Sequence, residues 1–155
     1  KELNLNDMVD NIANTFTLRV EHTGGHITTN LKAKHPTIYV DEMHFTNVIF
    51  NLIDNAIKYR NPDKGVEIYL KTWNDKENLF LSIKDNGIGI KKENLKKIFE
   101  KFYRVHTGNV HDVKGFGLGL AYVKKIVKLH KGEIHVESEK CKGTTFIISL
   151  PIIKK

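Results

Sequence analysis

The sequence predicts an α+β domain, and two kinds of pattern indicate this class. Apolar residues at three- and four-residue spacing, typical of amphipathic helices, recur in 6–21, 41–59, 95–102 and 118–129. Two segments, 66–83 and 133–150, each contain two stretches in which apolar and polar residues alternate, with a polar turn between the stretches. This pattern predicts two antiparallel hairpins. With 155 residues, of which 40% are hydrophobic, the chain can form one sizeable core, and we expect a single domain over 1–155.

Composition leaves several classes of partner open. The formal net charge of +7 is compatible with nucleic acid, an acidic partner, a membrane surface or a polyanionic small ligand. The lone Cys141 excludes an internal disulfide and a zinc site built from cysteines. No apolar run approaches the length of a membrane span, and no signal peptide is visible. Because the first residue is Lys1 rather than a methionine, we expect a piece of a longer chain.

The first quarter of the chain predicts one helix and two short strands. Asn6 is a suitable N-cap for a helix that runs to about Glu21. Apolar residues alternate over 27–31 as in a strand, Pro36 interrupts the path, and 38–40 forms a second short strand.

The next helix, predicted over 41–59 with Asp41 as its N-cap, carries two stripes. Its apolar stripe is expected to be buried: Phe45, Val48, Ile49, Leu52, Ile53, Ala56 and Ile57. A neighbouring stripe carries two amides, an ammonium group and a phenol: Asn51, Asn55, Lys58 and Tyr59. Amide oxygens one turn apart suit a hard cation such as Mg²⁺, and the lysine suits a phosphate, whereas the alternative is an ordinary solvated face.

The first hairpin ends in the turn Asp85-Asn86-Gly87-Ile88-Gly89-Ile90. Asp85 is either an ordinary turn-capping carboxylate or an acceptor for an amino group of a ligand, and the sequence leaves the two even. A lysine-rich helix is expected next, with its apolar residues on one side: Leu95, Ile98, Phe99 and Phe102. The stretch 104–115 shows neither the helical nor the strand spacing of apolar residues, and we expect a mobile loop there.

A second glycine-rich turn, Gly115-Phe116-Gly117-Leu118-Gly119-Leu120, opens the last predicted helix. Exposed N–H groups at the positive end of a helix dipole suit a phosphate, whereas the alternative is a turn that packs helices together. The turn lacks the Gly-Lys-Ser/Thr ending of a Walker loop and the spacing of a dinucleotide fingerprint. The helix is expected to bury one set of residues, Leu118, Tyr122, Ile126 and Leu129, and to expose another, Lys124, Lys125, Lys128 and Lys131.

Five short motifs follow one another along almost the whole chain: Asn51-x-x-x-Asn55-Ala56-x-Lys58-Tyr59, Asp85-x-Gly87-x-Gly89, Phe99-x-x-Phe102-Tyr103-Arg104, Gly115-x-Gly117-Leu118-Gly119-Leu120 and Gly143-Thr144-x-Phe146. Together they resemble the catalytic and ATP-binding domain of a bacterial two-component sensor histidine kinase, within the superfamily shared with gyrase, the heat-shock chaperone and mismatch-repair ATPases. The resemblance implies a Bergerat-type two-layer sandwich, with a mixed sheet of about five strands on three main helices, and a mobile ATP lid.

The resemblance also implies the roles of the site residues. Asn51 would ligate Mg²⁺, and Asn55 and Lys58, the other two residues expected to be catalytic, would contact phosphates or metal-bound water. Tyr59 would lie beside the nucleotide. The adenine end would be formed by Asp85, which accepts from the amino group, by Gly87 and Gly89, which let the backbone approach, and by Thr145 on the far side. The lid would begin near Arg104, and its hinge and phosphate cradle would be the turn Gly115, Phe116, Gly117, Leu118, Gly119 and Leu120.

One position favours histidine as the phosphoryl acceptor. Members of the superfamily that hydrolyse ATP, or phosphorylate serine, usually carry a glutamate four residues before the motif asparagine as a general base. This chain has Asn51 there, and an amide cannot take a proton. A histidine nucleophile is already neutral near physiological pH and needs no strong base.

The acceptor itself is expected outside this chain. In the family it lies in a dimerisation domain, and none of the histidines here has its motif: His22, His26, His35, His44, His106, His111, His130 and His135. The expected partners are therefore that dimerisation and phosphoacceptor domain and, through it, a response regulator receiver domain. We expect the isolated domain to be a monomer, the full-length protein a homodimer, and the location cytoplasmic, as part of a membrane-anchored sensor kinase.

Two other functions compete with a kinase domain. One is a non-catalytic module in which ATP only orders the lid. The other is a nucleic-acid-binding module, suggested by the net charge of +7, but the sequence lacks an interleaved aromatic stacking surface, so we expect no nucleic acid partner.

Overall fold

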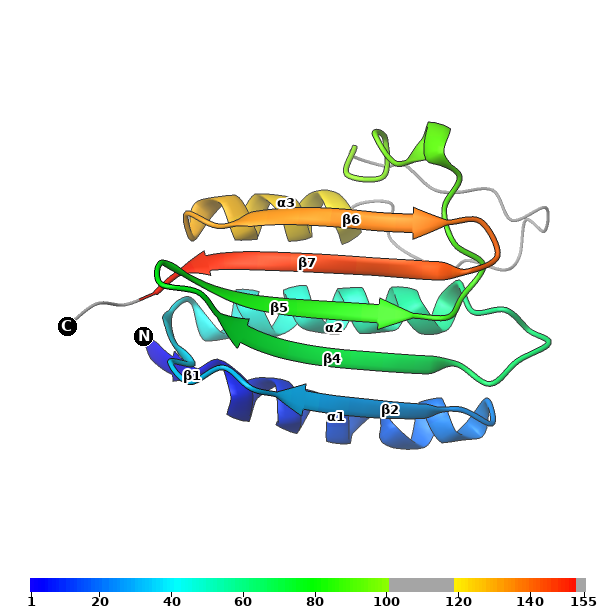
Figure 1. Ribbon diagram of the computed structural model, residues 1–155, viewed down its shortest axis with the longest axis horizontal. Helices are drawn as coiled ribbons and strands as arrows, with labels where there is room; N and C mark the ends of the chain where they lie inside the picture. The colour runs from blue at the N-terminus through cyan, green and yellow to red at the C-terminus, as the bar shows by residue number, and fades with distance from the viewer. Residues whose placement is uncertain (101–118, 153–155) are drawn as a thin grey trace.

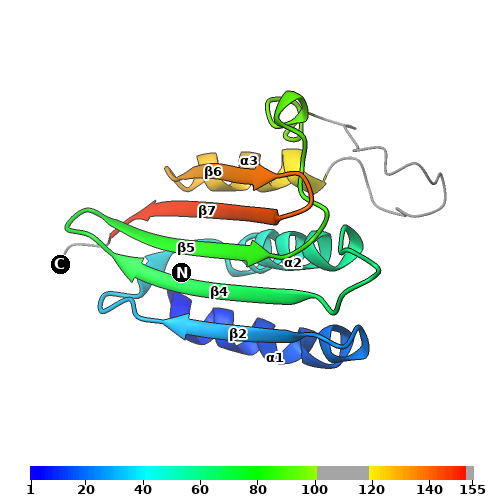
Figure 2. The same ribbon diagram turned by 45° about the vertical axis from the view of Figure 1, so that its right-hand side comes forward.

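The computed structural model describes residues 1–100 and 119–152. Within these ranges three helices, α1 (Leu5–His22), α2 (Glu42–Lys58) and α3 (Gly119–Leu129), lie on one face of a five-stranded sheet, and no described element covers its other face (Figure 1, Figure 2). This arrangement confirms the predicted α+β sandwich of three main helices on a five-stranded sheet.

The sheet is mixed, with its strands in the order β2 (His26–Leu31), β4 (Glu67–Asn74), β5 (Asn78–Asp85), β7 (Gly143–Pro151) and β6 (Glu133–Glu139). β2 and β4 are parallel because the chain between them passes through α2, and the remaining pairs are antiparallel. Both predicted hairpins, β4–β5 and β6–β7, are therefore confirmed.

The core lies between α2 and the inner face of the sheet. All seven residues of the predicted apolar stripe on α2 are buried, and Asp41 caps the helix by accepting the amide N–H of His44. The inward-facing residues of β4 and β5 are buried opposite them, including Ile68, Leu70, Leu81 and Ile83. The apolar and polar stripes of α2 consequently fix which residues of this helix face the sheet and which remain at its margin.

The N-terminus differs from the prediction. A short strand, β1 (Glu2–Asn4), pairs antiparallel with β3 (Thr37–Tyr39), and the N-cap of α1 is Asn4 rather than Asn6. Asn4 accepts the amide N–H of Asp7. Asn6 already lies in the first turn, where its side chain bonds to the Ala33 carbonyl and the Thr72 hydroxyl. Local sequence could not separate the two asparagines, because both suit a cap and only the pairing of β1 with β3 decides where the helix begins.

The predicted lysine-rich helix is a series of tighter turns as far as residue 100. A 3₁₀ helix, η1 (Lys92–Asn94), is followed by turns whose hydrogen bonds join residues three apart, such as Leu95 N–H to the Lys92 carbonyl. With about three residues per turn, residues three apart lie on the same side, so this geometry serves the spacing of Leu95 and Ile98 as an α-helix would. Ile98 is buried against the core.

The buried face of α3 was predicted only in part. Ile126 is buried as expected, but Leu129 is 68% exposed, and the other buried residues are Val123 and Val127. At about 100° of rotation per residue, Leu129 lies on a different side of α3 from Val123, Ile126 and Val127. The four lysines expected to be solvated are exposed.

Candidate functional site

A pocket of about 60 Å³ opens at the end of the molecule where α2 and β5 both end. α2 and its C-cap contribute Asn55, Ala56 and Tyr59. The turn after β5 contributes Asp85, Gly89 and Ile90, and the remaining wall is formed by Ile98, Leu120, Thr144 and Phe146. Mostly apolar walls around a few polar groups are typical of a small-molecule site.

Asp85 is the buried charged group of this pocket. The residue is 9% exposed, and its Oδ1 accepts the backbone N–H of Gly87 at 2.8 Å and that of Thr144 at 3.2 Å. Burial raises the pKa of the Asp85 carboxyl to about 6, although the two N–H donors oppose the shift. In the described residues no donor contacts Oδ2, so one oxygen of a buried carboxyl lining the pocket is left for a ligand.

The turn after β5 is fastened to its surroundings on three sides. Ile88 donates its N–H to the Tyr59 carbonyl at the end of α2, and its own carbonyl accepts the N–H of Cys141 from the β6–β7 turn. Ile90 donates to the Ser138 hydroxyl at 2.7 Å. These bonds fix the backbone that positions Asp85, and Ser138, which sequence reasoning missed, is one of the supports.

Glycines are required where this turn meets its neighbours. Gly89 has a φ of +73°, and a Cβ there would lie 2.0 Å from the Glu139 carbonyl oxygen. Gly143 has a φ of +108°, and a Cβ would lie 2.0 Å from the carbonyl oxygen of Asp85. Each glycine therefore allows a close approach of two backbone segments that no other residue would permit.

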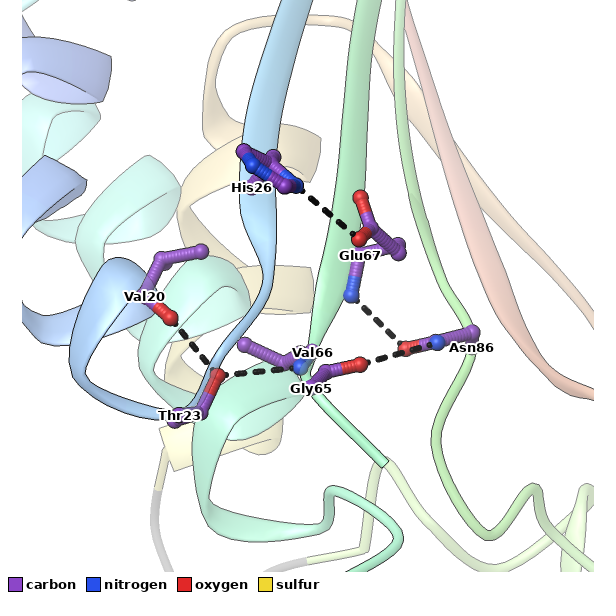
Figure 3. Close-up of polar contacts among 7 residues, drawn as sticks. All are labelled: Val20, Thr23, His26, Gly65, Val66, Glu67 and Asn86. Carbon is purple, nitrogen blue, oxygen red and sulfur yellow. Dashed lines mark hydrogen bonds and ion pairs between the residues drawn. The ribbon is translucent and has the colours of Figure 1, made fainter.

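Asn86, which does not line the pocket, anchors the same turn to the start of β4. Figure 3 shows its side chain between two backbone groups: Oδ1 accepts the N–H of Glu67 at 2.8 Å, and Nδ2 donates to the Gly65 carbonyl at 3.1 Å. Next to it, the Thr23 hydroxyl accepts the N–H of Val66. Thus Asp85 and Asn86, adjacent in sequence, have different tasks, with one lining the pocket and the other holding the turn.

The structure separates the predicted polar stripe of α2 into two groups. Asn55 and Tyr59 line the pocket. Asn51 lies one turn earlier, beside the start of α3, where its Oδ1 is 3.9 Å from a Cβ built on Gly119. Lys58 is not among the lining residues of the pocket, and its Nζ pairs with Asp54 Oδ2 at 2.9 Å.

Asp54 connects two helices and was missed from the sequence. Its Oδ1 accepts from the Arg19 guanidinium of α1 at 2.9 Å while its Oδ2 pairs with Lys58. Burial raises the pKa of the Asp54 carboxyl, but the hydrogen bonds and charges of Lys58 and Arg19 outweigh burial and hold it below its usual value. The spacing of Asp54 and Lys58, four residues apart on a helix, was a sequence signal for this pair.

The threonine of the pocket is one residue earlier than predicted. Thr144 lines the pocket and is buried, whereas Thr145, the predicted residue, is absent from the lining. Successive side chains of a strand point to opposite faces, and β7 directs Thr144 inward. The Thr144 hydroxyl bonds to that of Ser138 at 2.8 Å.

Several of the predicted site residues belong to the segment 101–118, between the two described ranges. Of the lid and the second glycine-rich turn, Arg104, Gly115, Phe116, Gly117 and Leu118 lie outside the described residues, as does the whole of the loop 104–115 that was predicted to be mobile. Gly119 and Leu120 form the first turn of α3, and Leu120 lines the pocket.

The described residues contain neither a metal-binding cluster of histidine, cysteine or acidic side chains nor a membrane-spanning helix. No group of three or more histidine, cysteine, aspartate or glutamate side chains there is arranged to hold a metal ion. Among the helices of these residues, none combines the length and the hydropathy that crossing a bilayer requires.

Comparison with known proteins identifies the family. The model of the histidine kinase-, DNA gyrase B- and HSP90-like ATPases matches residues 40–154. The chain is 62% identical over 154 residues to sensor protein RprX of Bacteroides fragilis, and 38% identical over 122 residues to sensor histidine kinase WalK of Bacillus subtilis. These matches cover 99% and 79% of this chain but only 30% and 20% of the relatives, so the chain spans less than a third of either.

Solved structures show the same fold. The nucleotide-free catalytic domain of histidine kinase ThkA superimposes with a TM-score of 0.83 at 24% identity, covering 98% of this chain and 97% of that domain. Full-length ShkA in complex with AMPPNP gives a TM-score of 0.84 at 24% identity, covering 100% of this chain and 31% of ShkA. Taken with the family match over residues 40–154, the chain belongs to the histidine kinase-, DNA gyrase B- and HSP90-like ATPase family, as a catalytic domain of the sensor histidine kinase type.

Proposed function

We propose that this domain binds Mg-ATP and transfers the γ-phosphoryl group to a histidine on a separate dimerisation and phosphoacceptor domain. The observation that carries the proposal is the buried Asp85 carboxyl, which lines an apolar pocket with one oxygen saturated by backbone donors. The second oxygen would accept a hydrogen bond from the adenine amino group. Guanine has a carbonyl at that position, so the same contact would select ATP over GTP.

The phosphates would extend along α2 from the pocket toward the start of α3. Asn55 lines the pocket, and Asn51, one turn further from Asp85, lies beside Gly119 at the N-terminus of α3. The N-terminus of a helix carries unpaired N–H groups and a partial positive charge, which suit a phosphate. Lys58 would supply a further positive charge.

The oxygen ligands that are present fit a magnesium ion, provided that the nucleotide phosphates supply part of its coordination shell. The described residues contain no cluster of acidic side chains, but the amide oxygens of Asn51 and Asn55 project from one face of α2. Mg²⁺ in nucleotide sites is commonly held by few protein oxygens together with phosphate oxygens and water. When bound, the ion would neutralise charge that develops on the transferred phosphoryl group.

The acceptor would come from outside this chain. The position four residues before Asn55 is an asparagine, Asn51, which cannot act as a base for water or serine. A neutral histidine needs no such base. Two relatives are a sensor protein and a sensor histidine kinase, and ThkA has been solved in complex with the response regulator TrrA, which supports a receiver domain as the next acceptor. We expect the domain to act in the cytoplasm as part of a membrane-anchored kinase.

The direct test is incubation of the domain with γ-labelled ATP and Mg²⁺, with and without a matching phosphoacceptor domain. The proposal predicts label on the acceptor histidine, and none on an acceptor with that histidine replaced by alanine. Nucleotide binding without any transfer would instead support the non-catalytic module.

Replacement of Asp85 tests the adenine contact. Asp85→Asn should weaken ATP binding by about 1.5–3 kcal/mol, the range for a hydrogen bond to a charged group, and should reduce the preference for ATP over GTP. Asp75→Asn is the matched control, because Asp75 Oδ1 also accepts two backbone N–H groups, but in an exposed turn at the other end of the hairpin. If both variants bound ATP as tightly as the parent, Asp85 would only be a turn cap.

A further inference from the structure

Lys58 lies within reach of two partners, the Asp54 carboxylate and a ligand in the pocket. Its Nζ lies 2.9 Å from Asp54 Oδ2, so in this structure it is engaged by a carboxylate of its own helix rather than directed into the pocket. The Lys58 and Asp54 side chains are 29% and 28% exposed, so the pair lies at the margin of the site.

Helix geometry explains how one lysine can serve both sides. Successive residues of an α-helix are rotated by about 100°, so Asp54 and Lys58 share a face, and Tyr59 lies about 100° further round. Tyr59 lines the pocket, which places Lys58 between the pocket and Asp54. A lysine side chain is a flexible stem of four carbons, and its ammonium group can therefore reach either Asp54 or the pocket.

We propose that Asp54 is a positioning residue that holds Lys58 away from the nucleotide phosphates until they bind, and that Arg19 keeps the Asp54 carboxylate paired after Lys58 leaves. This inference rests on the proposed function, because it assumes that phosphates reach the Lys58 side of α2. It adds that ATP binding must exchange one ion pair for another, and that α1 takes part through Arg19.

The pairing of Asp54 makes this exchange possible. A half-buried carboxylate that lost its only cation would be destabilised, which would oppose release of the lysine. Asp54 has two cations on different oxygens, because Arg19 Nη2 lies 2.9 Å from Oδ1 while Lys58 pairs with Oδ2. The Arg19 guanidinium also lies 5.2 Å from the centre of the Phe16 ring, which holds it in place.

The test is the affinity of single variants for ATP, ADP and adenosine, measured by calorimetry. Asp54→Asn keeps the side-chain shape, removes the charge and frees Lys58, so ATP and ADP should bind about two- to fivefold more tightly, which matches the usual worth of a partly exposed ion pair. Adenosine, which has no phosphate, should bind as it does to the parent. Asp54→Ser should give the same pattern, should the asparagine variant fold poorly.

A double-mutant cycle ties the effect to Lys58. In a Lys58→Met background, Asp54→Asn should no longer change the affinity for ATP. Arg19→Gln should weaken ATP binding, because Lys58 is then the sole cation on Asp54, and adding Asp54→Asn should restore it. Melting curves for every variant check that the fold is intact.

Glu42→Gln is the matched control for net charge. Glu42 lies on the same helix and pairs with Lys1 at the same 2.9 Å, but it lies at the opposite end of α2 from Lys58. It should leave the affinity for ATP nearly unchanged. An equal gain from Glu42→Gln, a gain for adenosine, a gain that persists with Lys58→Met, or no gain from Asp54→Asn would each overturn the inference while the parent still bound ATP. Failure of the parent to bind ATP would refute the proposed function itself.

Discussion

At the scale of single residues, burial rather than hydrogen bonding distinguishes the site carboxylate. Asp85 and Asp75 each accept two backbone N–H groups through Oδ1. The two N–H donors lower the pKa of the exposed Asp75, whereas burial raises the pKa of Asp85 to about 6 despite its two donors. A carboxyl of this kind changes its charge close to neutral pH, so nucleotide binding should depend on pH.

The sign of that dependence follows from which form binds adenine. An amino group donates best to the ionised carboxylate. At a pH below the Asp85 pKa of about 6, adenine binding must therefore first remove a proton from this carboxyl. The affinity for ADP should therefore rise between pH 5 and pH 7.5. The expected rise is about tenfold, because the pKa of the carboxyl lies one unit above the lower pH. Calorimetry on the parent and on Asp85→Asn separates this effect from titration of the ADP phosphates, which both proteins share. Equal pH dependence in the two would contradict the prediction.

Two glycines of the site offer a matched comparison of stability. Gly143→Ala forces a side chain onto a φ of +108° and places its Cβ 2.0 Å from the Asp85 carbonyl oxygen, so the free energy of unfolding should fall by about 2–4 kcal/mol. Gly119→Ala places a Cβ in ordinary contact, 3.9 Å from Asn51 Oδ1, in the first turn of α3, and should change stability by less than about 1 kcal/mol. Urea unfolding measures both. Similar losses from the two substitutions would mean that the close approach at Gly143 is relieved by movement of the turn.

At the scale of elements, α2 and α3 are joined at the end remote from the pocket by histidines. His130 donates Nδ1–H to the Ile126 carbonyl and accepts the N–H of Asp41 at Nε2, which defines its neutral tautomer. His44 Nδ1 lies 2.8 Å from the Tyr122 hydroxyl. The His130 contacts fix the C-terminal end of α3 against the N-cap of α2, and the Tyr122 contact joins the first turn of α3 to the first turn of α2.

Removal of His130 should therefore loosen the attachment of α3. His130→Ala deletes both hydrogen bonds and the edge contact with the Phe45 ring, and should lower the free energy of unfolding by about 1–2 kcal/mol. His135→Ala is the control, because His135 is exposed on β6, and its effect should stay within about 0.5 kcal/mol. The measurement is denaturant unfolding of the two variants. Indistinguishable midpoints would show that the hydrogen bonds of His130 add nothing to the stability of the domain.

At the scale of the whole molecule, net charge should assist capture of a polyanion. The chain carries a formal net charge of +7, and ATP is strongly negative at neutral pH. Long-range attraction of this kind raises the association rate and is screened by salt. The association rate constant for ATP should fall several-fold between about 0.05 and 0.5 M KCl in stopped-flow experiments, while that for adenosine should hardly change. A salt-independent rate for ATP would show that electrostatic attraction does not control its capture.

The sequence by itself determined much of the architecture of this protein. The three- and four-residue spacing of α2 predicted all seven of its buried residues, and alternation predicted both hairpins, because these periods follow from local backbone geometry. The order of the motifs along the chain was enough to indicate the family. These features depend on residues close together in sequence, which is the range over which a pattern carries information.

The tertiary structure decided the details that depend on distant neighbours. The N-cap of α1 lies at Asn4 because β1 pairs with β3, and Thr144 rather than Thr145 enters the pocket because the register of β7 against β5 sets the inward face. The burial that shifts the pKa of Asp85, and the pairing of Asp54 with Arg19 across two helices, likewise join residues far apart in the chain. No local pattern records such contacts, since each arises only when separate elements pack together.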